Sequence, residues 1–132
     1  MILREVLHAH IPTLNAQSTV RDAVDRMDVY QFPALVLVSD DLAPTHVITE
    51  GDIARAVTQR GNLIDLCHEK ASHFASADPV TAGPDLEIGD ALHLMLSRGL
   101  TVLPIVETSR LIGIVLRVDL MQAMLMDITP QA

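Results

Sequence analysis

The chain has very few aromatic residues and a single cysteine. One tyrosine and two phenylalanines are its only aromatic residues among 132, and tryptophan is absent. Proteins that hold single-stranded nucleic acid usually stack its bases on aromatic rings, so this composition argues against such a site. Because Cys67 is the only cysteine, an intrachain disulfide is excluded. The core must be built from aliphatic side chains, which favours α/β layers over an aromatic-rich β-sandwich.

Positive charge is also scarce. Nine Lys and Arg residues stand against 17 Asp and Glu residues, for a net charge of −8 at pH 7. A general nucleic-acid binder needs a basic face to neutralise phosphates, so we expect no nucleic-acid partner. No apolar run approaches the roughly 20 residues that span a bilayer, and Glu5 lies where a signal peptide would carry its apolar run. We therefore expect a soluble, cytoplasmic protein without a membrane partner.

The residues that bind metals or catalyse reactions are not arranged for either task. His8 and His10 are two positions apart and His68 and His73 are five apart, and neither spacing aligns two ligands on one helix face. No cluster of cysteines or carboxylates completes a metal site. We find no Ser–His–Asp or Cys–His pattern and no Gly-rich phosphate loop. We expect no metal ligand, no catalytic residue and no required cofactor.

The sequence does contain an internal repeat. The stretches Thr45–Val57 and Ile112–Met124 each read as a short apolar strand, an aspartate and a helix. Asp52 and Asp119 are 67 positions apart, and each lies where a helix N-cap would lie. Such a carboxylate can accept bonds from backbone N–H groups or from the hydroxyls of a ligand.

The repeat extends over the whole chain. Upstream of these stretches, matching residues of the two halves are 68 positions apart, whereas Pro33 and Pro104 are 71 apart. This difference predicts that the second copy has three extra residues before its proline and four fewer residues in the hairpin that follows. The predicted strands are 32–38, 47–49, 102–106 and 111–116, and further extended segments are predicted at 11–14 and 79–81. The predicted helices are 2–9, one capped by Ser18 or Thr19, 52–59, one that begins at Asn62, one that ends at Gly99, and 119–126. Residues 127–132 are predicted to form a tail.

Each copy therefore reads as βαββα preceded by a short helix. We predict an α/β fold with a first repeat at 1–61 and a second at 62–132. Units of this size are marginal alone, so we expect them to share a core and to pack about a pseudo-twofold axis with clefts between them.

These phrases resemble the CBS domain, named after cystathionine β-synthase, present as a tandem pair. Each copy has a strand that opens on a proline, Pro33 in the first and Pro104 in the second, followed by strand–Asp–helix. The resemblance implies a regulatory module, not an enzyme, that binds an adenosine nucleotide or adenosyl compound between its repeats. AMP, ADP, ATP, S-adenosylmethionine, NAD-type molecules and cyclic dinucleotides are all possible ligands. It further implies a homodimer that passes the signal to an effector protein, which the sequence does not identify.

The resemblance also implies which residues bind the ligand. The family's motif is Gly, two apolar residues, Thr or Ser, two variable residues and Asp, and its carboxylate accepts ribose hydroxyls. Site A would combine Thr49, Asp52 and, at the motif glycine, His46 with Val80, Thr81 and Ile105. Site B would combine Asp119 with Pro12, Thr13 and Ala34, and it has Gly113 but Leu116 in place of the hydroxyl. Site A keeps the hydroxyl–Asp pair and is the preferred site.

Simpler roles exist for the same residues. Asp52 and Asp119 could serve only as helix caps, whose loss costs about 1 kcal/mol, and Thr49 could be an ordinary strand residue. His46 would either crowd the cleft or donate to a phosphate. The two departures from the motif, His46 and Leu116, favour an alternative function, a ligand-free module for dimerisation or protein interaction.

Overall fold

The computed structural model describes residues 1–128, which form two compact units. Unit 1 contains Met1–Ile11 together with the chain from Val80 onward, and unit 2 contains Pro12–Pro79. The N-terminal segment therefore belongs with the C-terminal half of the chain. The division at 61/62 concerns the repeat along the sequence and stays a prediction. Residues 129–132, the end of the predicted tail, lie outside the described residues.

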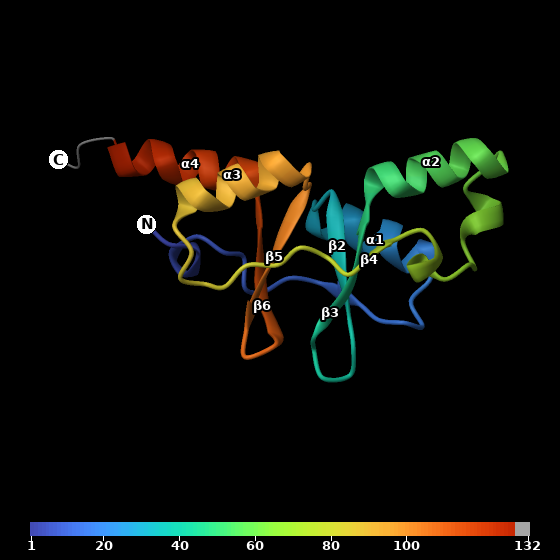
Figure 1. Cartoon of the computed structure of the whole chain (residues 1–132). Helices are drawn as coiled ribbons and strands as arrows, with labels where there is room; N and C mark the ends of the chain where they lie inside the picture. Colours follow the sequence, from blue (N-terminus) through green and yellow to red (C-terminus); the bar gives the residue numbers. More distant parts are fainter. Residues whose placement is uncertain (129–132) are drawn as a thin grey trace. The chain divides into compact units, whose positions relative to one another are not determined.

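Unit 2 is built on a four-stranded sheet (Figure 1). Its elements are β1 (Thr13–Leu14), α1 (Val20–Tyr30), β2 (Ala34–Val38), β3 (Pro44–Thr49), α2 (Glu50–Arg60), the 3-10 turns η2 (Ile64–Leu66) and η3 (Ala71–His73), and β4 (Ser76–Ala77). The strand order is β1-β2-β3-β4, with β1 parallel to β2 and the other neighbours antiparallel. All five residues of β2 are buried, as predicted for a central strand.

Unit 1 repeats this plan with shorter outer strands. Its elements are the 3-10 turn η1 (Leu3–Glu5), α3 (Ile88–Arg98), β5 (Val102–Glu107), β6 (Arg110–Leu116) and α4 (Arg117–Ile128). β5 and β6 are antiparallel, Ala82 bridges to Ile105 in parallel, and His8 bridges to Ile114 in antiparallel fashion. The order Ala82, β5, β6, His8 matches β1-β2-β3-β4, with the N-terminal segment in the fourth place.

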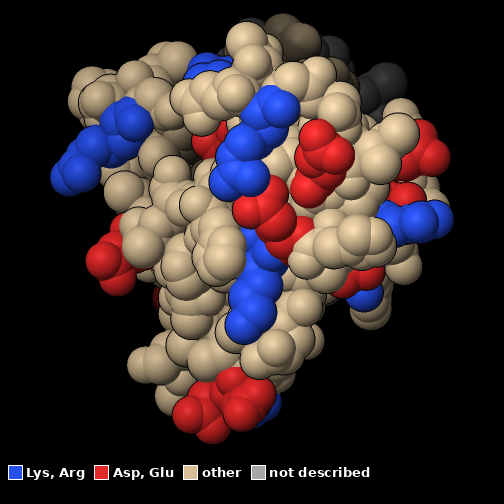
Figure 2. Space-filling view, turned by 90° about the vertical axis from the view of Figure 1, so that its right-hand side faces the viewer, with Lys and Arg blue, Asp and Glu red and all other residues tan. Residues whose placement is uncertain are grey.

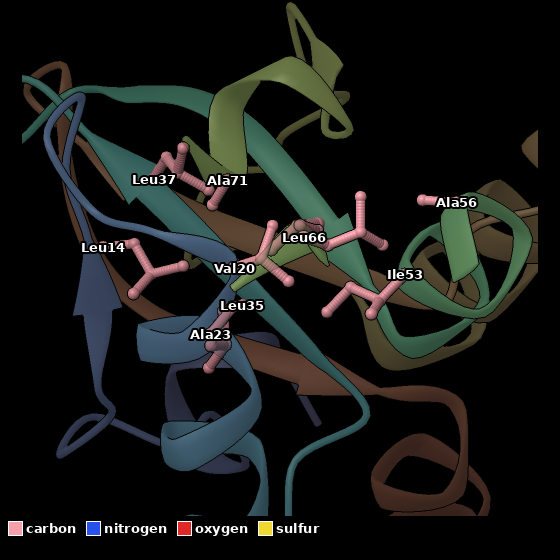
Figure 3. Close-up of a cluster of buried hydrophobic side chains, with 10 residues drawn as sticks. Leu14, Val20, Ala23, Leu35, Leu37, Ile53, Ala56, Leu66 and Ala71 are labelled. Atoms are coloured by element: carbon pink, nitrogen blue, oxygen red, sulfur yellow. The ribbon is translucent and has the colours of Figure 1, made fainter. Parts of the chain in front are cut away.

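Each unit has its own aliphatic core. In unit 2, side chains from α1, α2 and the sheet meet between the helices and the strands (Figure 3). The buried cluster comprises Leu14, Val20, Ala23, Leu35, Leu37, Ile48, Ile53, Ala56, Leu66 and Ala71. The cluster of unit 1 comprises Leu3, Ile88, Ala91, Met95, Leu103, Ile105, Val115, Leu120 and Ala123. All these buried residues are aliphatic, and the partly buried Phe74 packs against the cluster of unit 2.

Capping residues set the limits of the helices. Thr19 caps α1, because its Oγ1 accepts the Asp22 N–H at 3.2 Å while the Asp22 carboxylate accepts the Thr19 N–H at 2.9 Å. The bond from the Thr19 backbone lowers the pKa of the Asp22 carboxyl, since it favours the ionised form. Gly61 and Gly99 follow α2 and α3 with φ values of 99° and 63°, as predicted for helix ends.

The predicted helix at 2–9 is wrong beyond its first turn. Only Leu3–Glu5 is helical, as a 3-10 turn. The N–H of His8 donates to the Ile114 carbonyl and the His8 carbonyl accepts from Ile114, at 2.9 and 3.1 Å. These bonds hold the segment in an extended conformation beside β6. The predicted helix from Asn62 is likewise reduced to η2, at Ile64–Leu66.

The structural repeat also corrects the predicted alignment of the prolines. The first residues of β2 and β5, Ala34 and Val102, are 68 apart, and so are the residues that end α1 and α3. Pro104 is therefore the counterpart of Val36, not of Pro33, and the second hairpin is shorter by one residue instead of four. Pro104 fits inside β5 because its carbonyl accepts from Ala82, which directs its nitrogen away from β6.

Candidate functional site

Asp52 lies at the start of α2 in unit 2. Thr49 is the N-cap, and its Oγ1 accepts the Asp52 N–H at 3.0 Å while Asp52 Oδ2 accepts the Thr49 N–H at 2.9 Å. This reciprocal pair is a capping box. The prediction that Asp52 occupies the N-cap is therefore wrong, because Asp52 is the third residue of the helix. The pairing of Thr49 with Asp52 holds the carboxylate in one orientation.

The other oxygen of Asp52 contacts Arg55. Arg55 Nη2 lies 2.5 Å from Asp52 Oδ1, and the arginine side chain is 70% exposed whereas the aspartate is 14% exposed. Each carboxylate oxygen therefore has one donor and retains one further acceptor position. A pair of adjacent hydroxyls, such as the ribose diol, can still donate to both oxygens at once.

Asp119 lies at the equivalent place in unit 1, as the third residue of α4. Its Oδ2 accepts the Leu116 N–H at 2.8 Å. Leu116 has no hydroxyl, so the reciprocal bond to the Asp119 N–H is missing. His8 Nε2 lies 2.9 Å from the same Oδ2. Both donors thus act on one oxygen, and within residues 1–128 no donor reaches Oδ1.

The glycine of the motif has a packing role in unit 1. A Cβ added to Gly113 would lie 2.6 Å from the His8 carbonyl oxygen and 2.6 Å from Leu7 Cδ1. The absence of a side chain at Gly113 therefore allows the N-terminal segment to pack against β6. This approach brings the His8 ring to Asp119.

In unit 2 the corresponding position carries His46. His46 pairs with Leu37 of β2 and with Ala77 of β4, and its Nδ1 lies 3.0 Å from Thr45 Oγ1. Ser76 of β4 stands opposite Val47, where unit 1 has His8 opposite Ile114. Asp52 is therefore approached by Arg55 from its own helix, whereas Asp119 is approached by a histidine from another segment.

The remaining predicted residues are divided between the units. In unit 2, Thr13 opens β1, and Ala34 is fully buried and is the cross-strand partner of Thr49. Ala34 and Thr49 are thus neighbours although they were predicted for different sites. Pro12, predicted for site B, is the first residue of unit 2.

In unit 1, Val80 packs against the core cluster, and Thr81 is exposed. Ile105 belongs to that cluster and has no exposed surface. The assembly of sites A and B from both units stays a prediction.

Acidic and basic side chains are interspersed on the face of the molecule that Figure 2 shows, without a continuous basic area. Among residues 1–128, no three His, Cys, Asp or Glu side chains are arranged to hold a metal ion. No helix within that range is long and apolar enough to cross a membrane.

Sequence reasoning missed the contribution of His8. In the sequence His8 is notable only for its spacing from His10, and its partner Asp119 is 111 positions away. A signal did exist in the repeat, since Ser76 is 68 positions after His8 and both precede an extended segment. That signal predicts the strand position of His8 and not its side-chain contact.

Comparison with known proteins identifies the repeat. The CBS domain family model matches residues 3–59 and 71–126. An arabinose 5-phosphate isomerase, KdsD of Yersinia pestis, is 28% identical over 92% of this chain and 37% of its own length. An uncharacterised 17.7 kDa protein of Acidianus ambivalens is 33% identical over 81% of this chain and 63% of its own. The chain thus spans less than two thirds of the length of these relatives.

Solved structures share the fold. CBSX2 in complex with AMP superposes with a TM-score of 0.82, at 18% identity, over 96% of this chain and 97% of that one. The CBS domain pair of MJ0100, in complex with 5′-methylthioadenosine and S-adenosyl-L-methionine, gives a TM-score of 0.80 at 19% identity, over 96% and 98% of the two chains. At these identities the likeness establishes the fold alone.

Proposed function

This chain belongs to the CBS domain family, with two repeats, and from that premise we propose that it is a regulatory module that binds an adenosine nucleotide or adenosyl compound. The ligand would lie between the repeats, with Asp52 or Asp119 accepting the ribose hydroxyls. Neither a catalytic group nor a resident cofactor takes part in this proposal. The fold neighbours solved with AMP and with S-adenosyl-L-methionine support the class of ligand.

The observation that carries the proposal is the state of the Asp52 carboxylate. It is mostly buried, fixed by the Thr49 N–H and Arg55, and retains an acceptor position on each oxygen. A charged acceptor that is held in place before binding loses little entropy when it takes two hydroxyl donors, and charge-assisted bonds are the stronger kind. Asp52 therefore supports site A as the principal site.

The proposal is tested by calorimetric titration with AMP, ATP and S-adenosylmethionine. Protein freed of co-purified nucleotide is compared with its Asp52→Asn and Asp119→Asn variants, which keep the shape of the side chain and remove its charge. We expect micromolar binding that is weakened about tenfold or more in Asp52→Asn, since a bond to a charged group contributes about 1.5–3 kcal/mol. Asp22→Asn, which changes an equivalent capping carboxylate in α1, serves as the control.

Binding that is unchanged in both Asp52→Asn and Asp119→Asn would contradict the assignment of these carboxylates to the ribose. Absence of heat with all three ligands, from folded protein, would contradict the nucleotide-binding function. In that case the second candidate function, a ligand-free interaction module, would account for the fold plan that the two units share.

The second candidate is favoured by one surface of unit 1. Val118, Met121 and Leu125 lie on α4 at spacings of three and four residues, and they are 62%, 48% and 57% exposed. This spacing places the three side chains on one face of the helix. We propose that this α4 face contributes to a homodimer. In the nucleotide-binding module proposed first, the same dimer would carry a ligand-dependent change to an effector protein. Such a transmitted change requires a ligand whose affinity differs between two arrangements of the module.

A further inference from the structure

The two motif aspartates differ in how their oxygens are used. At Asp52, one donor acts on each oxygen, Thr49 N–H on Oδ2 and Arg55 on Oδ1. At Asp119, both donors act on Oδ2, from the Leu116 N–H at 2.8 Å and from His8 Nε2 at 2.9 Å. A carboxylate oxygen has two lone-pair positions, so Oδ2 of Asp119 is fully occupied.

This difference decides how each carboxylate can hold a diol. Two adjacent hydroxyls bind a carboxylate in bidentate fashion when each donates to a different oxygen. Asp52 can accept this arrangement as it stands. Asp119 can offer only Oδ1 while His8 is in place, because the bond from Leu116 belongs to the start of α4 and is retained with the helix.

We propose that His8 competes with the ligand diol for Asp119 and so determines the affinity of that half of the module. This inference rests on the proposed function and assigns a role to a residue outside the family motif. Bidentate binding of a ribose at Asp119 requires the imidazole to leave Oδ2. The imidazole is the more exposed partner, with 40% of its side chain exposed against 20% for the carboxylate.

The backbone of His8 is held against β6 by bonds that do not involve its side chain. Both main-chain groups of His8 bond to Ile114, and Gly113 allows the close approach. The backbone can therefore stay in place while χ1 and χ2 of the side chain rotate the ring away from Asp119. In unit 2 the equivalent Ser76 is too short to act as a competitor, and Asp52 retains its bidentate capacity.

The test measures AMP binding in the Asp52→Asn background, which isolates Asp119. We expect His8→Ala to raise the affinity for AMP about fivefold, the factor that corresponds to one hydrogen bond of about 1 kcal/mol. His8→Gln keeps a side-chain donor and should show a smaller gain. His10→Ala, two residues away and exposed, is the matched control and should leave the affinity unchanged.

A second ligand separates competition from a general loosening of the unit. The 2′,3′-dideoxy form of AMP cannot donate two hydroxyls to Asp119, so His8→Ala should leave its affinity unchanged. The 15N chemical shifts of the imidazole provide a readout of the ring itself. They should report the tautomer with the proton on Nε2 in the free protein and should change when AMP, but not the dideoxy form, is added.

The outcomes separate the inference from the function on which it rests. Suppose that AMP binding requires Asp119 but that its affinity is the same with His8 as in the His8→Ala variant. This result overturns the competition and leaves the proposed function intact. Weaker binding in His8→Ala also overturns it, because His8 would then be a ligand contact. If AMP binds to none of the proteins, including the one with Asp52 unchanged, both the proposed function and the inference fail.

Discussion

Gly113 lies directly against the backbone of His8, and a Cβ at position 113 would be 2.6 Å from the His8 carbonyl oxygen. We predict that Gly113→Ala destabilises unit 1, because the added atom must displace the N-terminal segment from β6. Overpacking of this kind typically costs about 1–3 kcal/mol. Urea denaturation followed by circular dichroism measures the change in the free energy of unfolding.

Gly89→Ala is the control for this prediction. Gly89 lies in α3, where a Cβ would meet Met124 Cε at an ordinary contact distance of 3.8 Å. Alanine has the higher helix propensity, so this variant should be neutral or more stable by up to about 1 kcal/mol. Equal stability of Gly113→Ala and the wild type would show that the segment containing His8 is not held against β6.

The missing hydroxyl at the start of α4 gives a second prediction. Leu116 donates its N–H to Asp119 as Thr49 does to Asp52, but it cannot accept a bond in return. We expect Leu116→Thr to be more stable than Leu116→Val by about 1 kcal/mol, because only threonine completes the capping box. Threonine and valine have nearly the same shape, so the comparison isolates the hydroxyl. Equal free energies of unfolding would contradict the proposed cap.

A third prediction concerns acid. The bond from the Thr19 N–H lowers the pKa of Asp22 below its ordinary value of 3.8. A lowered pKa in the folded state adds stability that is present above the unfolded value and is lost as the pH falls through the folded value. The free energies of unfolding of wild type and Asp22→Asn should differ by about 1 kcal/mol from neutral pH down to about pH 4 and converge below it. A difference that persists at lower pH would contradict this account.

The capping box shows how much of the site could be predicted from the sequence. Thr-x-x-Asp occurs at Thr19–Asp22 and again at Thr49–Asp52, and Thr19 was one of the two residues predicted to cap its helix. The second aspartate was placed at the N-cap because it follows the strand in the strand–Asp–helix pattern, whereas the helix begins directly after its cap, Thr49, with Asp52 in its third position. The Thr-x-x-Asp pattern was therefore present in the sequence, and only the residue at the N-cap was predicted wrongly.

Contacts between distant segments could not be predicted in this way. The repeat period identified both units, but it did not show that residues 1–11 complete unit 1. Hydrogen bonds between strands depend on the backbone and leave little trace in the side-chain pattern, so only the spacing of 68 between His8 and Ser76 points to the bridge from His8 to Ile114. Pro33 and Pro104 were equated because of their chemistry, whereas strand position follows the spacing of 68.

The α4 face leads to a prediction about assembly. If Val118 and Met121 contribute to a homodimer, Met121→Lys should convert dimer to monomer, because burial of an unpaired ammonium is costly. Sedimentation velocity at several protein concentrations measures the change. Gln122→Lys adds the same charge at the next, exposed position and should have a smaller effect. A wild-type protein that is monomeric at all concentrations would contradict the proposed interface.

His46 provides the last prediction, because it stands where unit 1 has Gly113. Its ring is positioned by Thr45 Oγ1 at 3.0 Å, and its strand has neighbours on both sides, so the side chain must project from the face of the sheet. We expect His46→Ala to increase the affinity for AMP several-fold, since it removes the ring and keeps the Cβ that suits a strand. His46→Gly should increase it equally and lower the free energy of unfolding by about 1 kcal/mol. Loss of binding in both variants would instead make His46 a contact of the ligand phosphate, and calorimetry with adenosine in place of AMP would then show no effect of the substitution.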